Sequence, residues 1–152
     1  MDSLIRALDG EFARLHDETL KVVDHISFDD LFRRPQSQNF TVRSGGELLL
    51  RSAAAIEQTF GGITANLWDD PFEWTQPETL TSREKILEYL NEVEATRKLG
   101  FDLFRTDVDL TKEIMSPAGK IVLMPLLLDT LVRAADYFGR AEATFELMKR
   151  LD

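Results

Sequence analysis

The feature that most constrains the fold is an apolar repeat in the last stretch of the chain, Met124–Leu151. The repeating residues recur at alternating steps of four and three: Leu127, Leu131, Ala134, Phe138, Ala141, Phe145 and Met148. This spacing places them on one face of a helix with 3.6 residues per turn. Pro125 is tolerated because a first-turn N–H has no helical partner to lose. We therefore expect one long amphipathic helix that joins the core along this face.

Three earlier segments show the same kind of repeat. The first runs from about Asp2 to Asp24, the second begins at Ser44, and the third runs from about Ser82 to Arg105. Their inner faces are predicted to be Leu4, Leu8, Phe12, Leu15, Thr19, Val22 and Ile26; then Leu49, Ala53, Ile56, Phe60 and Ile63; then Ile86, Leu90, Val93 and Phe104. Arg97 lies on the predicted inner face of the third of these helices. We expect its hydrocarbon stem to pack against the core while its charged group reaches water.

Local signals support these helices and the connections between them. Ser44 with Glu47, and Thr81 with Glu84, have the spacing of a capping box. The second helix is apolar on more than one side, so it is buried either inside its own fold or at a dimer contact. The aromatic connection 68–80 is expected to pack against the body, and Pro117 within 114–123 favours a small hairpin.

The predicted fold class is all-α: a four-helix bundle forming a single domain over residues 1–152. It has a long connection between helices two and three, a short helical turn within 27–34, and a small hairpin before helix four. A chain of 152 residues suits one substantial core, and its 43% hydrophobic and 30% charged content is that of a globular protein.

Composition argues against several classes of partner. The net charge of −9 repels phosphate backbones, so we expect no nucleic acid partner. The longest apolar run, Ile121–Leu128, is far shorter than the roughly 20 residues that span a bilayer. The absence of cysteine excludes disulfides and thiolate chemistry. We expect no signal peptide, no membrane partner and a cytoplasmic location.

Two segments resemble motifs of the DinB-like bundle family. The stretch Ser44–Ala53, SGGELLLRSA, resembles the second-helix pattern S-x-G-E-L-L-x-H-L-A. The stretch Arg133–Arg140, RAADYFGR, resembles the last-helix pattern H-x-x-H-H-R-G-Q. The resemblance covers essentially the whole chain. It implies a four-helix bundle, often a homodimer, that holds a divalent metal on three histidines.

The three positions that match those histidines are Arg51, Arg133 and Tyr137. An arginine stays protonated and offers no lone pair, and a tyrosine ligates only as a phenolate. The chain's two histidines, His16 and His25, lie on or beyond the first helix, and we interpret them as ordinary surface residues. We therefore expect no metal and no other cofactor.

Arg51, Arg133 and Tyr137 could instead form a pocket for a small anionic ligand, since guanidinium groups bind carboxylates and phosphates. The alternative, which we favour, is that Asp129, Asp136, Glu47 or Glu57 neutralises the arginines. Asp129 with Arg133, and Glu47 with Arg51, have the favourable i, i+4 order.

Two functions remain open. The first is a metal-free, non-enzymatic small-ligand binder or interaction module, which we expect to be a homodimer through the leucine- and alanine-rich second helix. The second is a divergent transferase or hydrolase that keeps the family pocket and uses Tyr137 or a carboxylate as acid or base. We assign no catalytic residue and lean away from an enzyme.

Overall fold

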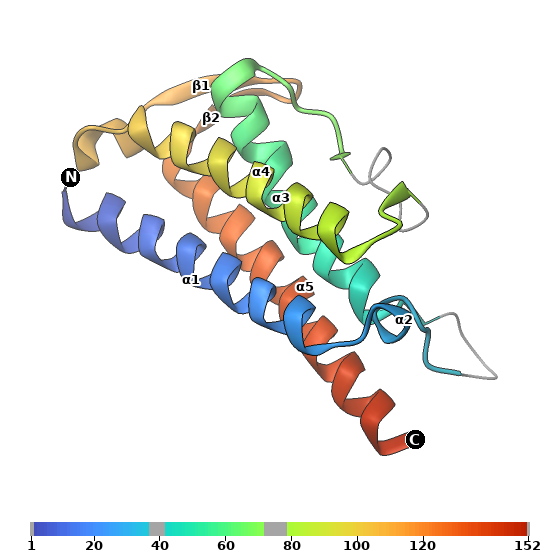
Figure 1. The fold of residues 1–152 in the computed structure, drawn as a ribbon. Coiled ribbons are helices and arrows are strands. Elements are labelled where there is room, and N and C mark those ends of the chain that lie inside the picture. The colour runs from blue at the N-terminus through green and yellow to red at the C-terminus, as the bar shows by residue number, and fades with distance from the viewer. Residues whose placement is uncertain (1, 37–41, 72–78, 152) are drawn as a thin grey trace.

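The computed structural model describes residues 2–36, 42–71 and 79–151, and this part of the chain is mostly helical with one small antiparallel hairpin (Figure 1). The helices are α1 (Ser3–His25), α2 (Phe28–Leu31), α3 (Gly45–Ala65), α4 (Arg83–Asp102) and α5 (Leu123–Leu151). A 3-10 helix, η3 (Asp107–Thr111), precedes strands β1 (Glu113–Ser116) and β2 (Gly119–Val122). The four long helices, the short helical turn and the hairpin were all predicted.

Hydroxyl side chains begin three of the helices. The Ser44 hydroxyl accepts a hydrogen bond from the Glu47 amide at 3.1 Å, as the capping signal predicted. The cap of α4 was predicted one residue too early, because Ser82 rather than Thr81 accepts from the Lys85 amide, at 3.2 Å. Ser27 caps α2 in the same way.

The four long helices pack side by side, with α1 and α3 on a diagonal and each flanked by α4 and α5. Hydrogen bonds between Ser52 and Ala134 and between Thr59 and Thr130 fix α3 antiparallel to α5. Figure 1 shows that α3 and α4 run in the same direction, so the end of α3 and the start of α4 lie toward opposite ends of the helices. Within the described residues, none of the helices has both the length and the apolar character needed to cross a membrane.

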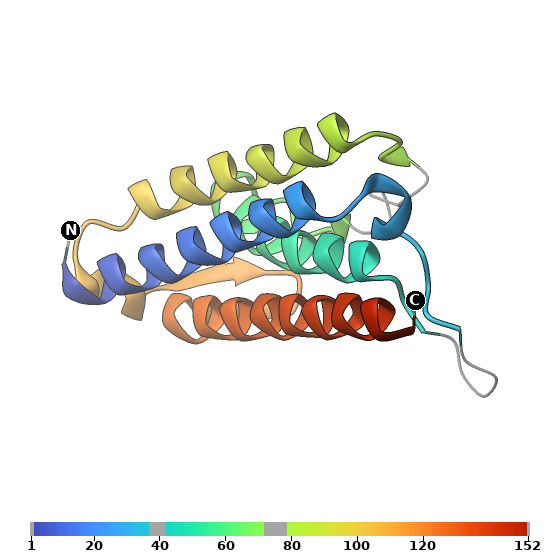
Figure 2. The ribbon, with the colours of Figure 1, turned by 60° about the horizontal axis from the view of Figure 1, so that its bottom comes forward.

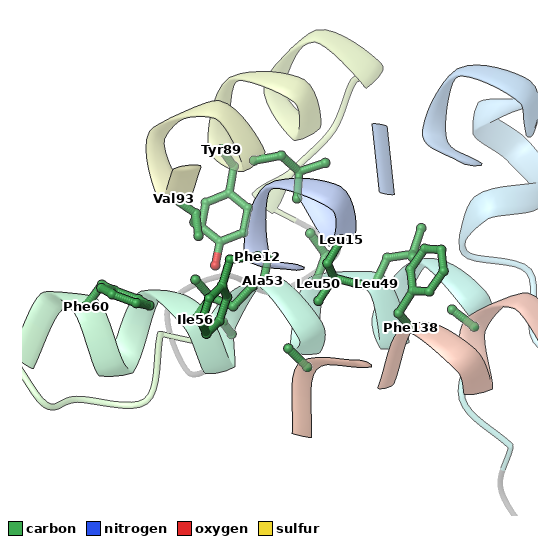
Figure 3. Packing of buried hydrophobic residues seen from close by; sticks show 14 of the residues in the cluster. Phe12, Leu15, Leu49, Leu50, Ala53, Ile56, Phe60, Tyr89, Val93 and Phe138 are labelled. Carbon is green, nitrogen blue, oxygen red and sulfur yellow. The ribbon is translucent and has the colours of Figure 1, made fainter. Parts of the chain in front are cut away.

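The centre of the core is a cluster of phenylalanine rings from three helices. Phe12 lies edge-on to Phe60 and to Phe101, with ring centroids 5.4 and 5.8 Å apart, and Phe60 stacks on Phe101 at 5.5 Å. Figure 3 shows Phe12 near Ile56 and Ala53 of α3, with Phe60 further along the same helix. Such ring pairs add to the stability gained from burial alone.

The predicted inner face of α1 was displaced by one residue at its ends. Ile5 is buried while Leu4 is 48% exposed, and Val23 is buried in place of Val22. The middle of the predicted face, from Leu8 to Thr19, is buried. The error arose because adjacent apolar residues at both ends allow two choices of face.

The open question about α3 is resolved by burial within this chain. Leu48–Leu50 and Ala53–Ala55 are all buried among the other helices. The helix also approaches α5 closely, since a Cβ at Gly45 would lie 2.3 Å from the Phe145 ring. These residues therefore serve the internal core and leave no apolar face for the dimer contact that was predicted through this helix.

The prediction for Arg97 was wrong, because its charge does not reach water. Arg97 is 1% exposed, and its guanidinium donates to Glu94 at 2.6 and 2.9 Å and to Asp9 at 2.6 Å. It also lies over the rings of Phe12 and Phe101, at 5.9 and 5.3 Å from their centroids. Burial alone would lower the pKa of Arg97, but its hydrogen bonds to Glu94 and Asp9 outweigh it and raise the pKa.

A second polar contact is buried between α3 and α5. The hydroxyl of Thr130 donates to the carbonyl of Leu126 at 2.8 Å, so the hydroxyl of Thr59 is the donor in the 2.6 Å bond between the two threonines. Both side chains are buried. The bond fixes how α3 and α5 align along their length.

Candidate functional site

The three positions matched to the family's metal ligands lie on α3 and α5. Arg51 is half-buried on α3, Arg133 is exposed on α5, and Tyr137 is half-buried one turn further along α5. The Ser52 hydroxyl donates to the Ala134 carbonyl at 2.7 Å. Because Arg51 and Arg133 directly precede these bonded residues, the two arginines stand at the same level of the α3–α5 contact.

The charges around these positions are largely engaged. Arg133 pairs with Asp129 at 3.1 Å, as predicted. Arg140 pairs with Asp136 at 3.0 Å, and its guanidinium lies 5.8 Å from the Tyr137 ring centroid. The acids of α5 therefore compete with any anion for its arginines.

Glu47, the acid predicted to neutralise Arg51, is held from another direction. Arg34, in the segment before α3, donates to its carboxylate at 2.7 and 2.9 Å. The Glu47 side chain is largely buried, whereas Arg34 is more than half exposed. This ion pair ties the segment after α2 to the first turn of α3.

These residues do not fit the family's metal ion. The two guanidiniums offer no lone pair, and the third position, Tyr137, is covered by a cation. In residues 2–36, 42–71 and 79–151, no group of three or more His, Asp or Glu side chains is arranged to hold a metal. His16 and His25 both lie on α1, where the Nδ1 of His25 donates to the Lys21 carbonyl at 2.7 Å.

The outer side of α5 carries a second apolar line, which we call the outer α5 stripe. Its residues recur at helical spacing and are all exposed: Leu128, Val132, Ala135, Gly139 and Ala143. Val132 is 66% exposed and Leu128 is 43% exposed. Figure 2 shows α5 at the edge of the molecule, with one long side turned away from the other helices.

Four charged residues lie beside this stripe on the same helix. In chain order they are Asp129, Arg133, Asp136 and Arg140, so their signs alternate. The structure pairs them within the helix as Asp129–Arg133 and Asp136–Arg140, and all four are exposed. They form a charged border along one flank of the stripe.

The outer α5 stripe was not predicted from the sequence, because the core face of the last helix carries the more hydrophobic repeat. The available signal was the i, i+4 pair Leu128–Val132, about 100° around the helix from the core repeat and followed by three small residues in step with it. Glu57 was considered only as an acid that could neutralise the arginines, and its contact with α4 was not predicted: it is half-buried and accepts a hydrogen bond from the Tyr89 hydroxyl at 2.8 Å. An isolated glutamate on a helix gives no comparable sequence signal.

Comparison with known proteins does not assign this chain to a family. No protein-family model matches it. No curated protein matches it either.

Proposed function

We propose that this chain is a divergent, metal-free member of the DinB-like four-helix bundles that acts as a non-enzymatic interaction module. In this proposal it forms a homodimer by pairing α5 with α5 of a second copy. The observation on which this rests is the outer α5 stripe, an exposed apolar line bordered by alternating charges. Exposed apolar lines rimmed by polar residues are typical of protein–protein contacts.

The support for the bundle assignment is structural and motif-based. The structure has four long helices in the expected order, with the hairpin before the last one. The two segments that resemble the family motifs lie on α3 and α5, where the resemblance implies them to be.

The charged border selects an antiparallel pairing of the two α5 helices. Asp129 and Arg140 are placed symmetrically about a point between residues 134 and 135, and so are Arg133 and Asp136. When two copies pair antiparallel about that point, each Asp129 faces Arg140 of the second copy, and each Arg133 faces Asp136. The contact is then self-complementary, as a two-fold dimer requires.

The size of the stripe sets the expected strength. From Leu128 to Ala143 the helix advances about 22 Å at 1.5 Å per residue. The small side chains of Ala135, Gly139 and Ala143 allow close approach but bury little area each. An interface below about 1,200 Å² is typical of weak complexes, so we expect a dissociation constant in the micromolar range or weaker.

The test is a variant in which all four charges are reversed: Asp129→Arg, Arg133→Asp, Asp136→Arg and Arg140→Asp. Within each helix the i, i+4 pairs remain opposite in sign, so the fold is preserved. We expect this variant to form its own dimer as the parent does. Mixed dimers between variant and parent are expected to be disfavoured, because every facing pair then has like charges.

Sedimentation equilibrium of each protein and of a fluorescently labelled mixture measures this difference. A Val132→Glu variant provides the matched control, since it should be monomeric while keeping the α-helical circular dichroism of the parent. Free mixing of parent and variant subunits would contradict the antiparallel pairing. A monomeric parent at high concentration would contradict the dimer.

The other functions predicted from the sequence have less structural support than the α5 dimer. An anionic ligand at Arg51, Arg133 and Tyr137 stays a prediction, and Asp129 already occupies Arg133. The divergent transferase or hydrolase also stays a prediction, with no arrangement in the described residues that favours it. A cytoplasmic location also stays a prediction.

A further inference from the structure

A pocket of about 460 Å³ opens between the carboxyl-terminal half of α3 and α4, away from the α5 face. The described residues that line it are Glu57, Gly61, Thr64, Ala65, Leu67, Asp69, Pro71, Thr96 and Leu99. Its volume lies within the range of small-molecule sites, which are mostly apolar with a few placed polar groups.

The polar groups of this pocket all present hydrogen-bond acceptors. Glu57 and Asp69 contribute carboxylates. The Thr64 hydroxyl donates its hydrogen to the Phe60 carbonyl at 2.7 Å, and the Thr96 hydroxyl donates to the Glu92 carbonyl at 3.1 Å. Each hydroxyl therefore turns only lone pairs toward a ligand.

The charged side chains that line the pocket in the described residues are all acidic. Its described lining contains two carboxylates and no lysine, arginine or histidine. Glu57 is half-buried, and burial, together with the nearby charge of Glu92, raises its pKa even though the hydrogen bond from Tyr89 works in the opposite direction. The two carboxylates, with no cation beside them in the described lining, favour a positively charged ligand.

The walls of the pocket are apolar and accessible. Leu67 and Leu99 are each 62% exposed and stand on its two sides, one after α3 and one on α4. Ala65 and Pro71 add apolar surface between them. A ligand with a hydrocarbon body would cover these side chains, which the protein itself leaves open to water.

We propose that this pocket binds a small organic amine, with its ammonium group on Glu57 and Asp69 and its hydrocarbon part between Leu67 and Leu99. A charge-assisted hydrogen bond from the ammonium to Glu57 supplies orientation, and burial of the hydrocarbon supplies affinity. The Tyr89 hydroxyl, which reaches from α4 toward α3 (Figure 3), holds the Glu57 carboxylate in place from the other side. The site is separate from the α5 face and does not depend on dimer formation.

The experiment compares three probes of equal chain length by titration calorimetry and by amide NMR shifts: hexylammonium, hexanol and hexanoate. We expect hexylammonium to bind at least about tenfold more tightly than hexanol, and hexanoate to bind more weakly than either. The NMR shifts should centre on residues 57–69 and 96–99. Equal binding of hexylammonium and hexanol, or shifts elsewhere, would overturn the proposal.

Two variants with matched controls test the assigned residues. Glu57→Gln keeps an acceptor for Tyr89 and is expected to weaken hexylammonium about tenfold or more while leaving hexanol unchanged. Glu142→Gln removes the same charge from another part of the surface and should change neither. Leu99→Ser should weaken both probes, whereas Leu147→Ser, at another exposed leucine, should weaken neither. A Glu57→Gln variant that binds hexylammonium as the parent does would also overturn the proposal.

Discussion

Replacing Arg97 with methionine tests the contribution of the buried ion pairs that Arg97 makes with Glu94 and Asp9. The guanidinium is 1% exposed and is bonded to Glu94, whose side chain is 10% exposed, and to Asp9, which is one third exposed. Methionine keeps most of the hydrocarbon stem but removes the charge. Glu94 would then be buried without its cation, and the two phenylalanine rings would lose the guanidinium above them.

The expected cost follows from that burial. Removing one partner of a buried ion pair typically costs about 3–5 kcal/mol, because the remaining charge is left uncompensated. Since domains of this size are stable by only about 5–15 kcal/mol, the variant should be close to marginal. At about 2–4 °C per kcal/mol, the melting temperature should fall by roughly 6–20 °C.

The assay is urea unfolding followed by circular dichroism, with a second variant as the decisive comparison. Arg97→Met combined with Glu94→Leu removes both buried charges and leaves only the partly exposed Asp9, so it should recover most of the lost stability. Arg14→Met is the matched surface control, since Arg14 also pairs with two acids but is exposed. A single variant as stable as the parent would refute the reasoning, as would a double variant no better than the single one.

Two further substitutions test other contacts. Thr130→Val should cost about 1–3 kcal/mol in urea unfolding, because the buried hydroxyl of Thr59 loses its acceptor; Thr59→Val combined with Thr130→Val should cost less than the single change. Asp109→Asn should lower stability near pH 7. The Lys112 ammonium, then the amides of Thr106 and Arg105, hold the pKa of Asp109 below its ordinary value of 3.8. This contribution is therefore present above pH 3.8 and lost as pH falls through the lowered pKa, so parent and variant should converge in acid thermal melts.

The helices could be predicted from sequence because each repeats apolar residues at helical spacing. The periodicity of α5 placed Leu127, Ala134 and Phe138 in the core, and all three are buried. Ser44 marked the start of α3 through its side-chain cap. The errors were local, as at Leu4 and Ile5, where neighbouring apolar residues fit two faces equally well.

The site could not be predicted in the same way, because it depends on which segments meet. The charge of Arg97 was predicted to be exposed to solvent, because nothing in the sequence of its own helix shows that Asp9 of α1 lies opposite it. The apolar sides of α3 fitted both a core and a dimer contact, and only the packing of four helices separates these alternatives. Glu57 became a candidate for ligand binding only through the structure, in which it lines a pocket together with Leu67 and Leu99.

Cross-linking at single introduced cysteines tests the proposed α5 dimer most directly, because the natural chain has none. In the antiparallel pairing, Ala135 lies within one helical position of Ala135 of the second copy, whereas the two Leu147 residues lie 25 helical positions apart, about 38 Å. We therefore predict that Ala135→Cys is efficiently joined into dimers by a short bismaleimide and that Leu147→Cys is not. Efficient joining at both positions would indicate a parallel pairing, and joining at neither would contradict the α5 dimer.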